Sequence, residues 1–219
     1  MIEKLIDKQD SFEIIRDKLA YIVASEIANQ KILASNENKE ISLWDMKVYL
    51  ERSNPWEDYM NDVDNTTPIV NIWYDNSNFI GASSDTVERQ AVDGIYNIDV
   101  YAVANSSNNV LGGHNPGDYE ASISLQRAIR LVRNIIMSAN YTYLDLRGLV
   151  WQRMLQSITT FQPQQDRANA RAIIAGRLAL KVRFNEYSPQ YAGNVVELIS
   201  TKFRRIEDGQ IVIDADYQH

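Results

Sequence analysis

The sequence predicts an α+β fold in which a long helix packs on one face of a mostly antiparallel β-sheet. Apolar residues recur at helical spacing in two long segments, 11–34 and 118–139. Several other segments alternate apolar and polar residues, as strands do. Strands that follow one another in the sequence are joined by hairpins or loops, which favours antiparallel pairing. The expected order is α-β-β-β-α-β-β, followed by a C-terminal β-hairpin.

The first half of the chain is expected to contain one helix and three strands. The helix over residues 11–34 follows Asp10, and Glu13 comes three residues later, an arrangement typical of a capping box. Residues 56–68 indicate an acidic loop or a short helix, and residues 76–94 a connection. The three strands are predicted, in order, over residues 45–56, 69–75 and 95–104.

The second half is expected to contain the second helix and a long hairpin. The helix over residues 118–139 has an apolar stripe along one side, and Asp118 is its expected N-cap. Residues 148–163 and 171–187 are expected to be strands that pair with each other around a turn at residues 164–170.

The strand over residues 171–187 separates apolar from basic side chains in the stretch "GRLALKVRF", which begins at Gly176. Side chains alternate between the two faces of a strand, so one face is apolar and the other basic. The apolar face holds Leu178, Leu180, Val182 and Phe184, and the basic face holds Arg177, Lys181 and Arg183. We expect the apolar face to join the core and the basic face to meet something else.

The chain is expected to fold as one α+β domain over residues 1–187, with an extended arm or hairpin over residues 188–219. Ser188-Pro189 breaks the pattern after the last strand of the domain. Apolar and polar residues then alternate again on both sides of residues 207–210, which contain the Asp-Gly pair typical of hairpins. We expect this arm to touch a neighbouring chain.

The composition is ordinary for a soluble globular protein of 219 residues, with 45% hydrophobic and 23% charged residues. The absence of Cys excludes disulfides and thiolate metal sites. Neither a secretory signal nor a membrane-spanning apolar run is recognisable, so no membrane contact is expected. The net charge of -7 is uneven, because residues 1–119 carry -11 and residues 120–185 carry +7. This asymmetry indicates either a polarised surface or two parts that neutralise each other in one fold.

The sequence matches no known catalytic, cofactor or metal motif. The two histidines are His114, in a stretch rich in Asn and Gly, and the C-terminal His219. The Gly-x-Ser-x-Gly of a hydrolase is missing, and the glycines near His114 lack the spacing of a phosphate-binding loop. The acidic stretch over residues 57–64 lacks the Gly of a calcium loop. We therefore assign no catalytic, cofactor-binding or metal-binding residue, and expect a protein that is not an enzyme and needs no cofactor.

Two groups of basic residues lie on the predicted second helix and on the basic face of the last long strand. Three interpretations are open: contact with nucleic-acid phosphates, a subunit interface, or a solvated face. The acidic chain, with cations not interleaved with aromatic residues, argues against nucleic acid. We predict a subunit interface at Arg127, Arg130, Arg133, Arg177, Lys181 and Arg183.

The order of these elements resembles the tail terminator, or tail completion, proteins of long-tailed bacteriophages. The resemblance covers roughly residues 45–187, as judged from element order. It is carried by "IYNIDVYAVA", the helix "DYEASISLQRAIRLVRNIIMSA" and the paired strands "RGLVWQRMLQSITTFQ" and "RAIIAGRLALKVRFNEY". In that family a β-sheet carrying helices forms the protomer, and six protomers form a ring that caps the tail tube beneath the head.

The resemblance implies a structural virion protein at the head-proximal end of a phage tail, which ends tail-tube growth and joins the tail to the head connector. The implied partners are further copies in a hexameric ring, the tail tube or sheath protein, and the head connector or a neck protein, with DNA only as passing cargo. Such a protein is made in the bacterial cytoplasm and acts in the virion. Two alternatives are open: another neck or head-completion protein, or a soluble binding module or small enzyme that uses the loop around His114.

Overall fold

A five-stranded sheet forms the centre of the larger of two units into which the chain divides in the computed structural model. The larger unit spans Ile6–Tyr187, and the smaller includes Ser188–His219. The structure describes residues 9–62, 64–81, 85–86, 89–105, 107–108, 114–115, 117–163, 172–187, 198–204 and 211–218.

The long helices and the strands of the main sheet follow one another in the predicted order, and the short elements α2, β4 and β5 are additional. The helices are α1 (Ser11–Asn36), α2 (Asp58–Asn61) and α3 (Gly117–Ile136), with the 3-10 turns η1 (Ile41–Trp44), η2 (Pro55–Glu57) and η3 (Ala139–Tyr141). The strands of the larger unit are β1 (Lys47–Leu50), β2 (Ile69–Phe79), β3 (Arg89–Ala104), β4 (Ser107–Asn108), β5 (His114–Asn115), β6 (Val150–Phe161) and β7 (Ala172–Tyr187). The smaller unit contains β8 (Leu198–Arg204) and β9 (Ile211–Gln218).

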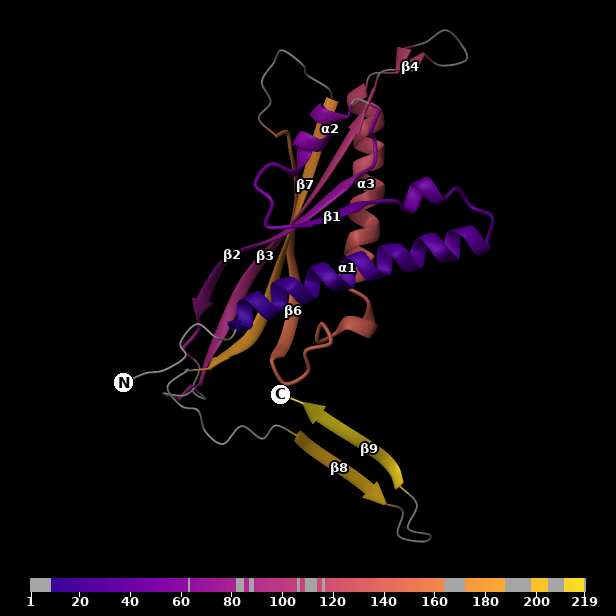
Figure 1. Cartoon of the computed structure of the whole chain (residues 1–219). Coiled ribbons are helices and arrows are strands. Elements are labelled where there is room, and N and C mark those ends of the chain that lie inside the picture. The colour runs from indigo at the N-terminus through magenta and orange to yellow at the C-terminus, as the bar shows by residue number, and fades with distance from the viewer. Residues whose placement is uncertain are drawn as a thin grey trace. The chain divides into compact units, whose positions relative to one another are not determined.

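The strands of the main sheet lie in the order β1-β2-β3-β7-β6 (Figure 1). β1 runs parallel to β2, and every other pair of neighbours is antiparallel. The longest ladder joins β3 to β7 and runs without interruption from Arg89↔Tyr187 to Ala104↔Ala172. The predicted α+β class, the mostly antiparallel sheet and the long hairpin of β6 and β7 are therefore confirmed.

Both long helices pack on the same face of the sheet, which we call the helix face. α1 buries apolar residues at helical spacing, and so does α3, so that each helix turns a stripe toward the strands. These stripes cover the apolar sides of the two central strands. The strand residues buried there include Tyr96, Ile98 and Val100 of β3 and Leu178, Leu180, Val182 and Phe184 of β7. The predicted core face of the last long strand is thus confirmed.

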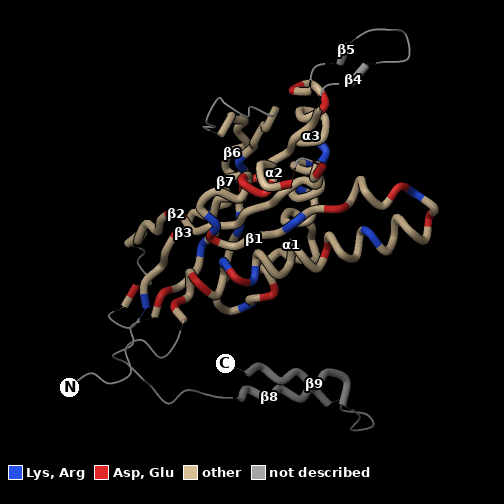
Figure 2. Tube along the Cα trace, turned by 45° about the horizontal axis from the view of Figure 1, so that its top comes forward, with Lys and Arg blue, Asp and Glu red and all other residues tan. Residues whose placement is uncertain are grey.

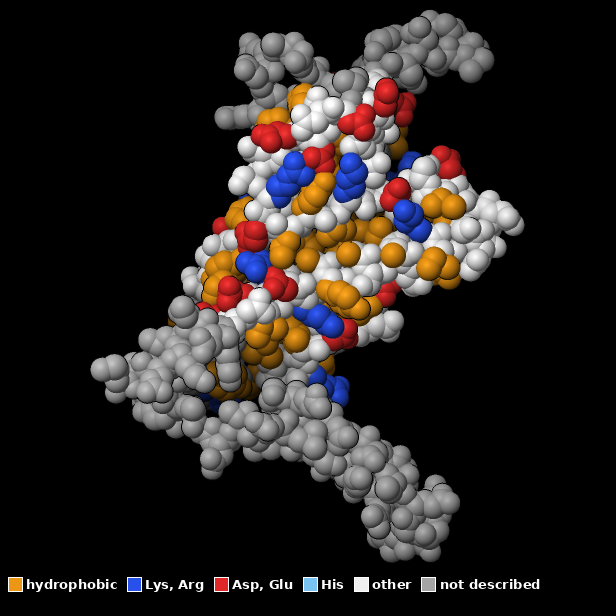
Figure 3. Space-filling model, in the orientation of Figure 1, with side chains coloured by type: hydrophobic (Ala, Val, Ile, Leu, Met, Phe, Trp, Pro, Cys, Tyr) orange, Lys and Arg blue, Asp and Glu red, His pale blue; other side chains and the backbone are white. Residues whose placement is uncertain are grey.

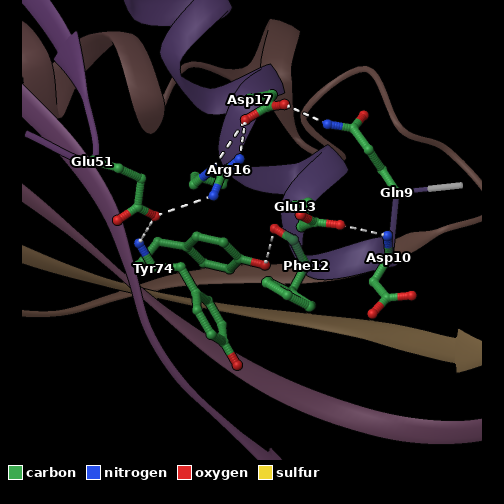
Figure 4. A network of polar contacts seen from close by, with 9 residues as sticks. Gln9, Asp10, Phe12, Glu13, Arg16, Asp17, Glu51 and Tyr74 are labelled. Atoms are coloured by element: carbon green, nitrogen blue, oxygen red, sulfur yellow. Dashed lines mark hydrogen bonds and ion pairs between the residues drawn. The ribbon is translucent and has the colours of Figure 1, made fainter. Parts of the chain in front are cut away.

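Polar contacts fix the beginning of α1 on the sheet (Figure 4). The backbone N–H of Asp10 donates to Glu13 Oε2 at 2.8 Å, as the predicted capping box requires. One turn later, the guanidinium of Arg16 lies 3.3 Å from Glu51 Oε1. The same oxygen accepts the backbone N–H of Tyr74 at 3.0 Å. The first turns of α1 are therefore linked to β2 as well as packed on the core.

A second, smaller core lies on the opposite face of the sheet, which we call the open face, and α2 covers it at one end. Tyr59 of α2 is fully buried, and its hydroxyl donates to the carbonyl oxygen of Tyr101 at 3.0 Å. The buried members of this core are Tyr59, Ile69, Tyr101, Val103, Ile173 and Ala175. Because Tyr101 and Val103 alternate along β3 with Val100 and Ala102 of the helix face, α2 and α3 lie on opposite faces of that strand.

The predicted connection over residues 76–94 is wrong at both ends, because β2 continues to Phe79 and β3 begins at Arg89. The ladder continues past a register shift between Tyr74 and Asn76. This end of β2 is polar and largely exposed, so the alternation that marks a half-buried strand is missing from its sequence.

Two element boundaries also differ from the prediction. The strand expected over residues 45–56 is limited to β1, because Glu51 adopts a left-handed conformation (φ 53°) that ends it. α3 begins at Gly117, so Asp118 lies in the first turn and is not the N-cap. An acidic side chain in the first turn still interacts favourably with the helix dipole.

The smaller unit is an antiparallel hairpin of β8 and β9, which confirms the predicted C-terminal hairpin. Its contact with a neighbouring chain stays a prediction. The predicted turns at residues 164–170 and 207–210 lie outside the described residues, as do the side chain of His114 and residue His219.

Candidate subunit interface

The open face carries the basic residues that the sequence singles out on β7. In an antiparallel ladder, residues directly opposite each other present their side chains on the same face. One row across β2, β3, β7 and β6 consists of Asn71, Asp99, Arg177 and Thr159. Another consists of Asn78, Asp93, Arg183 and Gln152. Each of the two arginines therefore lies opposite an aspartate of β3.

Asp99 is the centre of the most buried polar cluster on this face. Its carboxylate accepts two hydrogen bonds from Arg177, at 2.7 Å from Nε and 2.9 Å from Nη2. A third comes from Nε1 of Trp73 at 3.0 Å. The Asp99 side chain is 4% exposed and that of Arg177 is 37% exposed. The guanidinium also lies near the rings of Trp73 and Phe161, at 4.9 and 5.4 Å from their centroids. Aromatic contacts and a bidentate ion pair together hold Arg177 in place.

Asp93 forms a second cluster farther along the same strands. Nε and Nη2 of Arg183 lie 2.8 and 3.0 Å from its two carboxylate oxygens, and Nζ of Lys181 lies 3.4 Å from one of them. The hydrogen bonds from Arg183 are the main cause that holds the pKa of Asp93 below its ordinary value, and Lys181 adds to the effect.

The three cations of β7 are thus paired with acidic residues of their own sheet. Acidic residues of another copy are therefore not needed to explain these cations, because Asp93 and Asp99 already neutralise much of their charge. A subunit interface at Arg177, Lys181 and Arg183 remains a prediction. In such an interface these side chains meet the neighbouring copy as polar groups that already have partners in their own sheet.

The Asp93 pair should make the stability of the domain depend on pH in the acidic range. Because the folded pKa of Asp93 is lowered, its pairing stabilises the fold above the ordinary carboxyl pKa of about 4, and this stabilisation disappears as the pH falls through the folded pKa. Urea unfolding between pH 6 and 2 should show a shallower loss of stability for Asp93→Asn than for the parent. Equal slopes would mean that the pair does not contribute to this pH dependence.

The arginines of α3 differ from those of β7, because they have no partner among the residues that the structure describes. Arg127, Arg130 and Arg133 are exposed on the side of the helix that faces away from the sheet. In the part of the chain that the structure describes, none of the three forms an ion pair or a side-chain hydrogen bond. In Figure 2, Lys and Arg appear in blue and Asp and Glu in red along the chain trace. The structure therefore separates the six predicted interface residues into a paired group and an unpaired group.

The open face also contains a polar hollow of about 280 Å³ beside the Asp99 cluster. Its lining includes Glu51, Arg52, Asn71, Trp73 and Arg177. Arg52 is itself paired, at 2.7 Å, with Asp58. A hollow with paired charges of both signs suits a polar side chain of a docked protein. Figure 3, in the orientation of Figure 1, shows acidic and basic side chains interspersed on the side of the molecule where α1 and β1 lie toward the viewer.

β6 forms one edge of the sheet and lies next to the basic strand β7, whereas the short strand β1 forms the other edge. It is twelve residues long, most of its side chains are exposed, and it shifts register twice against β7. Its exposed apolar side chains are Trp151, Met154 and Ile158. An edge strand presents unpaired backbone groups that another chain can pair with.

Sequence reasoning did not identify the acidic partners on β3. Asp99 lies within the predicted strand over residues 95–104, but its pairing with Arg177 joins residues 78 positions apart. Asp93 was assigned to a connection. The charges could have indicated this pairing, because two predicted strands carry opposite charges on the faces that point away from the core.

Within the described ranges, no three His, Cys, Asp or Glu side chains gather where they could hold a metal ion. None of the described helices has the length and apolar character that a membrane crossing requires. Comparison of the sequence with protein-family models and with curated protein sequences finds no match.

Proposed function

We propose that this chain is a structural protein of a phage particle, which forms a ring at the head-proximal end of the tail. In this role it ends growth of the tail tube and joins the tail to the head connector. The observation that carries the proposal is the sheet itself, because α2 covers its open face at one end only and the long strand β6 forms one of its edges, as far as the described residues show. The assignment to a tail terminator rests on the element order described above.

The edge strand supports assembly rather than a monomeric role. Monomeric proteins usually protect a long edge strand with charges, prolines or a covering element. β6 instead exposes Trp151, Met154 and Ile158, and its one charged residue, Arg153, donates to the carbonyl oxygens of Tyr141 and Ser138. In a closed ring such an edge becomes a joint between copies.

The partners in this proposal are further copies of the chain, the tail tube or sheath protein, and the head connector or a neck protein. DNA passes through the ring and is contacted weakly and without sequence preference. A different neck or head-completion protein would use the same open face and edge. Its position in an assembled particle, located by electron microscopy, distinguishes that alternative from a tail terminator.

Charges on the edge strand should abolish the ring while leaving the monomer folded. Met154→Lys together with Ile158→Lys places two cations on β6, where a joining chain would bury them without partners. We expect rings of the parent chain in solution, by mass measurement and electron microscopy, and monomers of the variant with an unchanged melting temperature. Tyr21→Lys, on an α1 residue that is 65% exposed, serves as the control and should assemble normally. A parent chain that stays monomeric at every concentration would exclude the proposed function.

A further inference from the structure

Trp151 is the most prominent apolar residue on the edge strand β6. It is 52% exposed, and Met154 and Ile158 of the same strand are each 43% exposed. Trp, Tyr and Arg are enriched at the few positions that contribute most of the binding energy of a protein interface. Trp151 is therefore a candidate anchor for the surface of another protein.

A β-bulge separates Trp151 from the regular ladder of β6 and β7. Val150 pairs with Phe184, and Gln152 pairs with the next residue along β7, Arg183, so Trp151 is the extra residue between them. A bulge leaves its extra residue unpaired and changes the direction of a side chain. The local structure thus presents Trp151 at the edge of the sheet without a partner strand.

A hollow of about 420 Å³, which we call the α3 hollow, lies where β3 ends and α3 begins. Its lining includes the apolar residues Met46, Val103 and Ala128, which are 8%, 1% and 1% exposed. Pockets that enclose small ligands measure about 300–1,000 Å³, so an indole ring fits into this volume. The polar residues of its lining include Asp45, Thr66, Thr67, Glu120, Ser124 and Arg127.

The chemistry of the α3 hollow suits an indole ring. Indole is flat and apolar and has a single N–H donor, which needs an acceptor when it is buried. The hollow offers apolar residues for the ring, and hydroxyl and carboxylate oxygens as acceptors. Oδ1 of Asp45 already accepts from Nζ of Lys31 at 2.9 Å, but a carboxylate accepts more than one hydrogen bond. Because the lining carries charges of both signs, it favours neither an anion nor a cation.

Trp151 and the α3 hollow are too far apart to meet within one copy. Trp151 lies beside Arg183 of β7, whereas Val103 of the hollow pairs with Ile173 of the same strand. These two β7 residues are ten positions apart, which corresponds to about 33 Å along a strand. In Figure 1 the beginnings of β6 and α3 lie toward opposite ends of the sheet. Such an arrangement favours a heterologous, head-to-tail contact, which closes into a ring when the rotation allows it.

We propose that Trp151 of each copy inserts into the α3 hollow of the next copy. The inference rests on the proposed ring-forming function and deepens it by naming the anchor on β6 and the site that receives it. A second copy is the occupant because Trp151 belongs to the edge that forms the joint between copies in that proposal. Each copy also supplies one anchor and one hollow, so every joint of a closed ring is satisfied.

The test uses two variants of the full chain, each with a matched control. Trp151→Ala removes the anchor, and Phe79→Ala, which removes a 60% exposed aromatic residue from β2, is its control. Ser124→Phe fills the hollow with a ring from its own copy, and Ser25→Phe, at an exposed position of α1, is its control. Thr66→Phe, at an exposed position of the hollow, replaces Ser124→Phe if that variant does not fold. Circular dichroism and thermal unfolding check the fold, and light scattering gives the mass.

Trp151→Ala and Ser124→Phe should each weaken association by about thirtyfold or more, the loss typical of a dominant interface position. Both controls should assemble like the parent. At a concentration where neither variant assembles alone, an equimolar mixture should form dimers with one copy of each and nothing larger. Ser124→Phe supplies the Trp and Trp151→Ala the open hollow, and the other two surfaces of the dimer no longer match.

The absence of Cys from the chain allows the contact to be located by cross-linking. Gln152→Cys places a thiol next to Trp151, and Thr66→Cys places one at the α3 hollow. A short bismaleimide should join copies when these two variants are mixed. Neither variant should be cross-linked to itself. Cross-linking of Gln152→Cys alone would mean that two β6 edges meet each other, which would overturn the inference.

The remaining outcomes separate this inference from the proposed function. If Trp151→Ala assembles like the parent, or the folded variants stay monomeric when mixed, the inference is overturned and the ring remains. A Ser124→Phe variant that forms normal rings would leave the hollow to a different protein and overturn the inference as well. A parent chain that never assembles would remove the proposed function, and the inference with it.

Discussion

An aspartate in place of Leu19 should prevent the larger unit from folding. Leu19 lies in the middle of α1, is fully buried and packs among the apolar residues of the helix face. A carboxylate there has no cation or hydrogen-bond donor in its apolar surroundings, so its burial costs several kcal/mol or more. The whole stability of a domain is only about 5–15 kcal/mol. Far-UV circular dichroism and the dispersion of amide NMR signals measure the effect.

Tyr21→Asp is the matched control for this prediction. Tyr21 lies in the same helix two residues later and is 65% exposed, so its replacement should change stability by no more than about 0.5 kcal/mol. If Leu19→Asp and Tyr21→Asp melt at the same temperature, α1 is not an integral part of the core.

Replacing Asp99 by Ala should destabilise the domain by about 3 kcal/mol, near the lower end of the range for breaking a buried ion pair. The substitution leaves the guanidinium of Arg177 without its counter-charge and Nε1 of Trp73 without its acceptor. The lower end applies because the Arg177 side chain is 37% exposed and keeps some contact with water. Urea unfolding at neutral pH gives the change in free energy.

A double variant distinguishes a lost pair from a general disturbance of β3. Asp99→Ala combined with Arg177→Met removes both charges and should recover part of the stability that Asp99→Ala alone loses. Asp75→Ala, which removes an exposed carboxylate from β2, is the control and should have little effect. If Asp99→Ala costs no more than Asp75→Ala, the cluster does not stabilise the fold.

The pairing of the β7 cations changes how an interface test must be designed. Reversing Arg177, Lys181 and Arg183 to Glu would place new carboxylates next to Asp93 and Asp99. The resulting repulsion would destabilise the monomer, and a loss of assembly could not be attributed to a joint. The arginines of α3 have no such partners among the described residues, so their reversal tests association itself.

Local patterns in the sequence were sufficient where one side of an element is buried and the other exposed. Ile15, Leu19 and Ile22 recur at helical spacing, and this predicted the buried side of α1. The alternation from Arg177 to Phe184 likewise predicted both faces of β7. In both elements the environment changes with the period of the secondary structure, so the residue types record it.

The same reasoning failed where burial does not alternate or where contacts join distant residues. Both sides of the end of β2 are polar, so Asn76 and Asn78 did not indicate a strand. Tyr59 is fully buried beneath a four-residue helix, which is too short to show a period. The Asp93–Arg183 pair joins positions 90 residues apart, and nothing local to either residue specifies the other.

The long β3–β7 ladder also has a consequence for how the chain reaches its fold. β2 with β3, and β6 with β7, are hairpins of neighbouring segments, but the ladder that joins them brings together residues such as Asp99 and Arg177 across 78 positions. Closing so long a loop costs conformational entropy before the contacts form, which slows folding. We therefore expect the two hairpins to form early and their docking to be the slow step. Until that step is complete, β3 and β7 are both exposed edges, and a newly made chain is most prone to aggregate at the strands that later form its centre.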